Sequence, residues 1–222
     1  MKVLVIDTAL GLCTAGVFEV TDGQSRKLGL RSEAMTKGHQ ERLGGLAREA
    51  VEAAGGFDSI DRIGVTVGPG SFTGLRVGLA FSQGLGAALD RPVIGVSTLD
   101  ALAAGGASGT IAALIDARRG QVYARFWRDG APLGEAEALS LEAAADAVEA
   151  LGEDAVLVGS GAALIATGRP VVDKAGPDPE AIALLTAVAD PSLANARPLY
   201  LRAPDATPPT RLPGQPRPVA AR

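Results

Sequence analysis

The first half of the chain carries a pattern of strand, hairpin and helix signals that starts again near residue 110. A short apolar run, Val3 to Ile6, ends at Asp7, and the run from Thr110 ends in the same way at Asp116. Hairpin turn pairs follow both runs, Asp22-Gly23 in the first half and Asp129-Gly130 in the second. A repeated unit of this kind predicts two related α/β lobes that face a cleft.

The other elements follow from the spacing of the apolar residues. The first three strands, Val3–Ile6, Cys13–Val20 and Gln24–Arg31, should form an antiparallel meander. The helix after them, Lys37–Ala54, contains Gly44-Gly45, which favours a kink or a close neighbour. Further strands are expected at Ile60–Val67, Pro92–Val96, Gln121–Arg128 and Ala155–Val158, and further helices at Leu75–Leu89, Thr98–Ala104 (capped by Ser97 or Thr98), Ser140–Leu151 and Pro179–Ala189.

A length of 222 residues suits one large domain or two small ones. We expect the first lobe to span residues 1–104 and the second 105–202, with Gly105 to Gly109 as a hinge or linker. Residues 203–222 contain six prolines and almost no large apolar side chain. Such a segment cannot bury enough apolar surface to pack, so we expect a disordered tail.

Charge and cysteine content limit the classes of function. Acidic residues outnumber basic ones, 25 to 21, and the pI is about 5.1. A protein that grips a phosphate backbone alone is usually basic, so any role in nucleic-acid chemistry should be indirect. The single cysteine, Cys13, allows no intramolecular disulfide. With no signal-peptide pattern and no apolar run of membrane-spanning length, we expect a cytoplasmic protein without membrane contact.

The glycine-rich stretch from Gly68 to Gly74 has two interpretations. It can be a strand-to-helix turn with Thr73 as the N-cap, or an anion site at a helix N-terminus. A Walker loop requires a lysine that is absent here, and a dinucleotide fingerprint requires glycine where Thr73 stands. The structural turn is therefore the preferred interpretation.

The helix over residues 75–89 carries two stripes at four-residue spacing. One contains almost no side chains, and the other is apolar. Either both stripes are buried within the chain, or one meets a partner protein. The first stripe consists of Gly74, Gly78, Ser82 and Gly86, and the second of Val77, Phe81, Leu85 and Ala88.

Candidates for catalysis are few. Asp7 and Asp116 end equivalent strands and in a two-lobed fold would face the cleft, where acids can position a metal-bound nucleotide. The commoner role of such acids is to cap turns. His39 is the only histidine, so no zinc site of the usual His and Cys ligands can form within one chain. The Gly-x-Ser-x-Gly elbow of serine hydrolases is also absent. We expect His39 to be a surface or capping residue, and we expect no tightly bound metal or cofactor.

Four stretches resemble one protein family. The segment Gly68 to Gly78, GPGSFTGLRVG, is similar to the hallmark of the TsaB (YeaZ) family, and 92–102, 116–123 and 198–202 resemble its further motifs. The resemblance covers roughly residues 1–202. It implies the α/β fold of actin, sugar kinases and Hsp70, made of two duplicated lobes.

The resemblance also implies a role. Members of this family bind a larger relative, TsaD, which transfers a threonylcarbamoyl group to adenosine 37 of tRNAs that read ANN codons, and an ATPase, TsaE, joins the pair. TsaD-like enzymes carry a His-x-x-x-His pair, but Met35 stands where the first histidine would be if His39 is the second. A thioether is a poor substitute for imidazole in such a site. The family thus implies a non-catalytic subunit here.

The resemblance further implies where nucleotide and partner would bind. The candidates for nucleotide binding are Asp7, Thr8, Asp116 and Gly159. The loop at Gly159 lacks the double glycine expected of TsaD, so nucleotide binding is expected only at a cleft shared with the partner. Without the partner, the exposed apolar surface favours a homodimer. The expected partner interface in the first lobe consists of Leu43, Leu46, Leu75, Val77, Gly78, Phe81, Ser82 and Leu85. The alternative is a stand-alone ATP-dependent phosphotransferase or metallopeptidase of the same fold.

Overall fold

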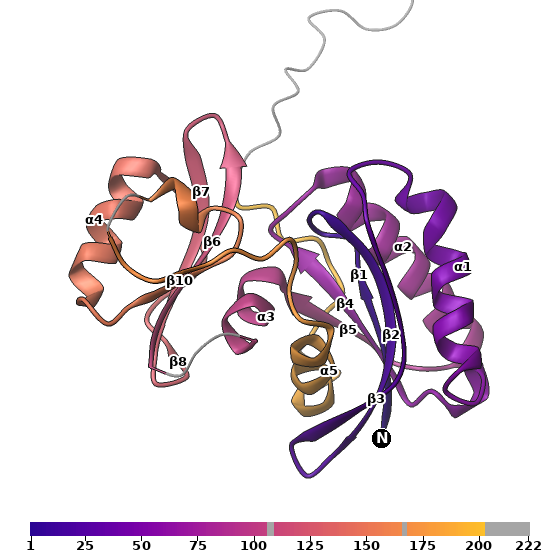
Figure 1. Cartoon of the computed structure of the whole chain (residues 1–222). Coiled ribbons are helices and arrows are strands. Elements are labelled where there is room, and N and C mark those ends of the chain that lie inside the picture. The colour runs from indigo at the N-terminus through magenta and orange to yellow at the C-terminus, as the bar shows by residue number, and fades with distance from the viewer. Residues whose placement is uncertain (106–108, 166–167, 203–222) are drawn as a thin grey trace, which may run out of the picture.

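The computed structural model describes residues 1–105, 109–165 and 168–202. Its strands form two sheets (Figure 1). The first sheet has the order β3 (Gln24–Ala34), β2 (Leu12–Thr21), β1 (Lys2–Asp7), β4 (Arg62–Gly68), β5 (Val93–Ser97). The second has the order β11 (Val171–Val172), β10 (Val156–Val158), β6 (Thr110–Arg118), β7 (Gln121–Arg128), β8 (Ala131–Pro132), and β9 (Glu137–Ser140) also pairs with β7.

The two sheets share one plan of pairing. In the first, β1 pairs antiparallel with β2 and parallel with β4. In the second, β6 pairs antiparallel with β7 and parallel with β10. The outer strands β5 and β11 continue each sheet in parallel. The duplication expected from the two hairpin patterns is therefore confirmed, and the chain has the two-lobed α/β fold of the actin, sugar-kinase and Hsp70 type.

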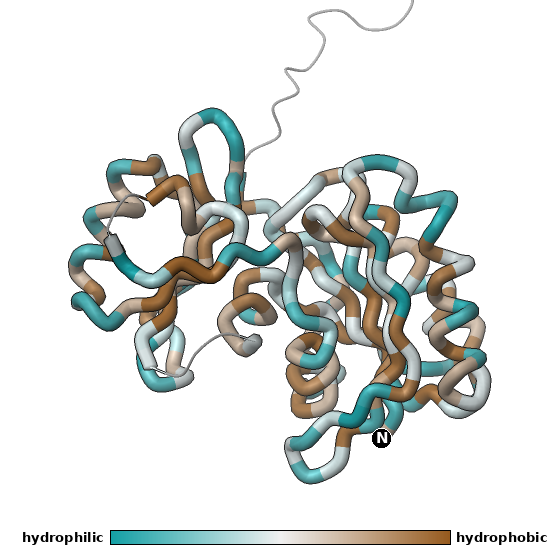
Figure 2. The backbone as a smooth tube through the Cα atoms, viewed as in Figure 1, coloured by the Kyte–Doolittle hydropathy of each residue, from teal (hydrophilic) through white to brown (hydrophobic). Residues whose placement is uncertain are grey.

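Alternation along β1 divides the core of the first lobe between the two faces of its sheet. Leu4 and Ile6 belong to a cluster with residues of α1 (His39–Glu52) and α2 (Phe72–Leu89), whereas Val3 and Val5 pack with residues of α3 (Thr98–Ala104) and α5 (Pro179–Val188). Figure 1 shows α1 and α2 side by side on the face away from the second lobe, with α3 and α5 between the two sheets. Figure 2 shows the hydrophobic residues gathered along the strands and on α5.

The last helix of the chain returns to the first sheet. α5 contacts β1, β2, β4 and β5, although it lies within the range 105–202 expected for the second lobe. Arg62 of β4 fixes its end, because the guanidinium donates to the carbonyl of Ala189 at 2.8 Å. The chain then covers the edge strand β5, where Ile94 forms a bridge with Asn195 and Gly95 donates its backbone N–H to the carbonyl of Ala194 at 3.1 Å. The second half of the sequence thus supplies part of the first lobe.

Several helix boundaries differ from the sequence-based expectations. α2 begins at Phe72 because Ser71, not Thr73, is its N-cap: the Ser71 hydroxyl accepts a bond from the backbone N–H of Gly74 at 3.2 Å. α1 begins at His39, after Gly38 in the left-handed region at φ 86°. The expected helices after Ser97 and Ser140 are confirmed as α3 and α4 (Leu141–Leu151), capped by those serines.

Some short elements were not expected, and some predictions cannot be compared. The 3₁₀ turn η1 (Phe57–Ser59) precedes β4, and η2 (Ala162–Leu164) occupies the position in the second lobe that α2 has in the first. Residues 106–108 of the expected hinge and the expected tail, 203–222, lie outside the described residues. Within the described ranges, no helix combines the length and apolar character needed to cross a membrane.

Candidate functional site

The face of α2 that turns inward is built from residues with little or no side chain. A Cβ added to Gly78 would lie 2.5 Å from the Thr8 hydroxyl, and the backbone of Thr8 leaves no room for a Cβ at Gly74. The Thr8 hydroxyl donates to the carbonyl of Gly74 at 2.7 Å, which ties the helix to the end of β1. The stripe of Gly74, Gly78, Ser82 and Gly86 therefore faces the chain's own sheet.

This arrangement corrects most of the expected partner interface. Five of the eight residues are buried within the lobe, because they pack against strands on the inward side of α1 and α2. A buried side chain cannot contact a second protein without opening the core. The five are Leu43, Leu46, Leu75, Gly78 and Ser82, and the other three, Val77, Phe81 and Leu85, are half-buried at the junction between the helices.

The outward side of the same two helices forms a surface that we call the open face. Gly84 and Ala80 of α2 are exposed, as are Gly44 and Gly45 of α1. A Cβ at Gly45 or Gly84 would meet no atom within 4 Å, and one at Gly44 would touch only the ring of Phe81 at 4.0 Å. The open face comprises Gly44, Gly45, Val77, Ala80, Phe81, Gly84, Leu85 and Ala88. Its signals in the sequence were the Gly44-Gly45 pair and the apolar stripe of the second helix.

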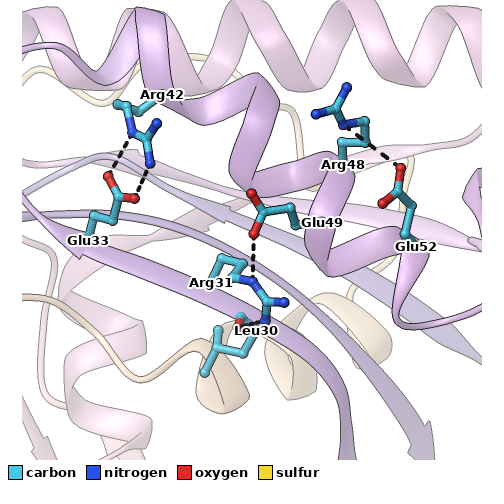
Figure 3. Close-up of polar contacts among 7 residues, drawn as sticks. All are labelled: Leu30, Arg31, Glu33, Arg42, Arg48, Glu49 and Glu52. Atoms are coloured by element: carbon cyan, nitrogen blue, oxygen red, sulfur yellow. Dashed lines mark hydrogen bonds and ion pairs between the residues drawn. The ribbon is translucent and has the colours of Figure 1, made fainter.

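Ion pairs border the open face on the side of β3 (Figure 3). Arg42 of α1 binds both carboxylate oxygens of Glu33 on β3, and this hydrogen bonding lowers the pKa of Glu33. Arg31 donates to Glu49 at 2.9 Å, and Arg48 lies 3.8 Å from Glu52. Four charged side chains of α1, those of Arg42, Arg48, Glu49 and Glu52, are thus paired beside the surface, and the open face itself consists of small and apolar residues.

A cleft of about 800 Å³ lies between the two lobes. The loop from Pro69 to Phe72 lines one side, the β6–β7 hairpin lines the other, and residues 199–202 close it. Asp116 reaches this cleft, as expected from its position at the end of a strand. Its carboxylate accepts a bond from the backbone N–H of Arg118 at 2.8 Å and pairs with the Arg118 guanidinium at 3.2 Å.

Asp7, the counterpart of Asp116, is enclosed and does not line the cleft. One oxygen accepts bonds from the backbone of Ala9 at 3.0 Å and the hydroxyl of Thr66 at 2.7 Å, while the other has no partner. Gly176 lies over this second oxygen, because a Cβ there would be 3.3 Å from it. Burial raises the pKa of the Asp7 carboxyl. The expectation that Asp7 faces the cleft is therefore wrong.

The other two nucleotide candidates also lie outside the cleft lining. Thr8 is buried beneath α2, and Gly159 is a buried residue at φ 106°, packed close to the carbonyl of Leu114. Of the four candidates, only Asp116 lines the cleft.

His39 is not the surface residue that its position near a helix start suggested. It is the first residue of α1, is 6% exposed, and its Nε2 atom has no partner. Met35 is half-buried and packs against the core cluster that contains Leu4 and Ile6. In the described parts of the chain, no three His, Cys, Asp or Glu residues are grouped so that they could hold a metal ion.

Comparison with known proteins gives these features a family. The family model for TsaD, tRNA N6-adenosine threonylcarbamoyltransferase, matches residues 17–185. An uncharacterized protein of Mycobacterium tuberculosis is 38% identical over 208 residues, which is 93% of this chain and 94% of that protein. The tRNA threonylcarbamoyladenosine biosynthesis protein TsaB of Escherichia coli is 36% identical over 136 residues, or 58% of this chain and 56% of TsaB.

Solved structures agree with this assignment. YeaZ from Pseudomonas aeruginosa is 26% identical, with a TM-score of 0.70 over 90% of this chain and 99% of that protein. The match is therefore long enough to include both lobes. Together with the hallmark segment at residues 68–78, the comparisons show that the chain belongs to the TsaB (YeaZ) family of tRNA threonylcarbamoyladenosine biosynthesis proteins, within the wider TsaD family.

Proposed function

We propose that the chain is a non-catalytic partner subunit of a TsaD-type transferase, which forms N6-threonylcarbamoyladenosine at position 37 of tRNAs that read ANN codons. The observation that carries the proposal is the open face. Two adjacent helices present small residues outward there, and a Cβ at Gly45 or Gly84 would have no atom of the described residues within 4 Å. A surface without protruding side chains lets a second helix pair approach closely, so that backbone and half-buried apolar groups make the contact.

The same surface accounts for the proposed self-association. An open face on a single chain leaves Phe81, Val77 and Leu85 only half covered. Such a patch favours pairing with an identical patch when the proper partner is absent. We therefore infer a homodimer in isolation and a heterodimer with the transferase. A TsaE-type ATPase would join that pair.

The residues of the cleft support a role without catalysis by this chain. Asp7 is enclosed, and the Asp116 carboxylate is paired with Arg118. The loop before α2 has no lysine to hold a nucleotide phosphate. The alternative, a phosphotransferase or metallopeptidase, would need an unpaired carboxylate in the cleft or a lysine that holds phosphate, and neither these two aspartates nor the loop before α2 provides one. With a net charge of −4, the chain would also leave most of the tRNA binding to the transferase.

Reconstitution tests this proposal. The purified chain, a TsaD-type subunit and the other components are assayed for threonylcarbamoylation of tRNA, with and without this chain, and complexes are followed by size-exclusion chromatography. We expect a complex with the transferase and tRNA modification that requires this chain. Asp116→Asn should keep full activity, because a scaffold needs no cleft carboxylate. ATP hydrolysis or peptide cleavage by the chain alone, abolished by Asp116→Asn, would support the enzyme alternative instead.

A further inference from the structure

Three residues at the mouth of the cleft form an exposed cluster that we call the aromatic rim: Phe72, Arg76 and Tyr200. The rings of Phe72 and Tyr200 have centroids 5.5 Å apart and an interplanar angle of 32°. The guanidinium of Arg76 lies 3.8 Å from the centroid of Phe72, and its Nε donates to the Tyr200 hydroxyl at 3.3 Å. Residues from the start of α2 and from the end of the described chain are thereby held in one arrangement.

The exposure of the aromatic rim is unusual for this chain. Aromatic residues make up only 4% of the sequence, and in the described parts of the chain the two exposed ones are Phe72, at 50%, and Tyr200, at 44%. Leaving such rings in water forgoes the stabilisation that burial gives. Their mutual contact and the bond from Arg76 fix both rings before any ligand arrives, which lowers the entropy cost of binding.

The charges near the aromatic rim are opposite in sign to those of the whole molecule. Arg118 and Arg202 line the cleft with Phe72 and Tyr200, and among the described residues that line it Asp116 is the one carboxylate. The chain as a whole has a net charge of −4. A flat aromatic wall beside arginines matches a ligand with a planar ring and a phosphate. A cleft of about 800 Å³ is large enough for one nucleotide.

We propose that the aromatic rim stacks an unpaired nucleobase of RNA, with the adjoining phosphate held by Arg76 and Arg118. The inference deepens the proposed function, since it gives this subunit one direct contact with the tRNA that the transferase modifies. Unpaired bases stack on aromatic side chains and arginine planes, whereas bases within a duplex are covered by their neighbours. A free nucleotide presents the same chemistry as an unpaired RNA nucleotide, so the test includes both.

A protein ligand at the aromatic rim is less well supported. Phe72 and Tyr200 line a concave cleft between the lobes, whereas the open face proposed for the transferase lies on the outward side of α1 and α2. Arg76 precedes Ala80 of the open face by one helical turn, so the two surfaces are neighbours and must be separated by experiment.

Fluorescence anisotropy with a labelled eight-nucleotide oligoadenylate RNA measures the contact, both for the full chain alone and for its complex with a TsaD-type subunit. Phe72→Ala should weaken binding about 5- to 100-fold, the usual effect of losing one stacked base. Phe72→Trp should retain binding, because it keeps an aromatic surface. Leu193→Ala is the matched control, since Leu193 is 79% exposed and does not line the cleft. Both positions are exposed, so all three variants should fold like the wild type.

The outcomes separate this inference from the proposed function. RNA binding that depends on Phe72, with the complex intact in size-exclusion chromatography, supports a stacking site. Competition by ATP, with the same dependence on Phe72, identifies a free nucleotide as the source of the base. A duplex that binds as tightly as the single strand, or a Phe72→Ala variant that binds RNA like the wild type alone and in the complex, overturns the inference. Loss of the complex without loss of RNA binding also overturns it and assigns the aromatic rim to the protein partner.

Discussion

The two faces of α2 are built from similar residues but do opposite things. The inward face has Gly74, Gly78 and Gly86, and the outward face has Ala80 and Gly84. Inward, the missing side chains let the helix lie against Thr8 and Val93, closer than a Cβ would allow. Outward, they leave a surface that the described chain does not cover at Gly84. A stripe of small residues therefore indicates close approach but not which neighbour approaches.

The largest effect is expected from a bulky residue on the inward face. Gly78→Leu would place its Cβ 2.5 Å from the Thr8 hydroxyl and its branched end among Ile6 and Val65. Overpacking of this kind typically costs about 1–3 kcal/mol. At this chain length, that loss lowers the melting temperature of the isolated protein by about 3–10 °C.

Thermal melting followed by circular dichroism measures this change, with Gly78→Ala as a milder companion variant. The buried position of Gly78 reverses the expectation from sequence, which placed Gly78 in the partner interface. A variant that melts like the wild type would contradict the packing described here.

The next effect concerns the outward face. Gly84→Leu introduces the same side chain two turns further along α2, where a Cβ meets nothing. We expect the isolated protein to melt at the same temperature or slightly higher, because leucine has a better helix propensity than glycine. Binding to the transferase should weaken by about tenfold or more through overpacking of the interface.

Isothermal titration calorimetry with the TsaD-type subunit measures this binding, and sedimentation of the isolated variant reports the homodimer. The control is Leu133→Ala, since Leu133 is exposed in the second lobe, away from the open face. Another exposed glycine, Gly23, is unsuitable as a control position, because its φ of 76° would strain a leucine there. Normal affinity for the transferase in Gly84→Leu would move the interface away from the open face.

The repeat in the sequence was sufficient to predict two related α/β lobes, because each half contains its own apolar runs and hairpin turn, whereas the actin-type fold was implied by the family resemblance. The hairpin turns at Asp22-Gly23 and Asp129-Gly130 fix antiparallel neighbours, and the apolar runs mark the central strands. The return of α5 to the first sheet was missed, because the helix is apolar on several sides and nothing in its pattern names the sheet that it covers.

The candidate site was less predictable, because a helix pattern does not identify the neighbour that the helix packs against. Periodicity assigns residues to stripes, but the direction of each stripe depends on tertiary neighbours such as Thr8 and Gly176, which are distant in sequence. Asp7 and Asp116 look equivalent in the sequence, yet the segment around Gly176 encloses one of them. The pairing of Phe72 with Tyr200 joins residues that no local pattern connects.

A smaller effect is expected from the enclosed carboxyl group of Asp7. Burial raises the pKa of Asp7 above its unfolded value, so the stability that its protonated form provides is lost as the pH rises through the folded pKa. Asp7→Asn keeps an acceptor for Ala9 and Thr66 without the charge. We expect the variant to melt higher than the wild type at pH 7, with no advantage below about pH 4, near the unfolded pKa.

Melting curves between pH 3.5 and pH 8, with Asp116→Asn as the control, test this pH dependence; the pH limits are chosen at roughly the ordinary aspartate pKa and about four units above it. Asp116 lines the cleft and is partly exposed, so its amide variant controls for the loss of one carboxylate elsewhere in the fold. If Asp7→Asn melts lower than the wild type by the same amount at every pH, the charge of Asp7 has a structural partner that the packing does not reveal.

The smallest effect is expected at the ion pairs that border the open face. Arg42 lowers the pKa of Glu33, so the stability from this pair is present above the unfolded glutamate pKa and is lost as the pH falls through the folded value. Both side chains are exposed to solvent, 55% for Arg42 and 36% for Glu33, and exposed pairs contribute little. Glu33→Gln should therefore lower the melting temperature at pH 7 by less than about 2 °C, and the difference should shrink further in high salt and at acidic pH.

Thermal melting in low and high salt measures this difference, with Glu52→Gln as the control, because Glu52 lies 3.8 Å from Arg48 within the same helix. A decrease as large as that of Gly78→Leu would mean that α1 is held on the sheet by its outward charges, and the division of work between the inward and outward sides of these helices would not hold.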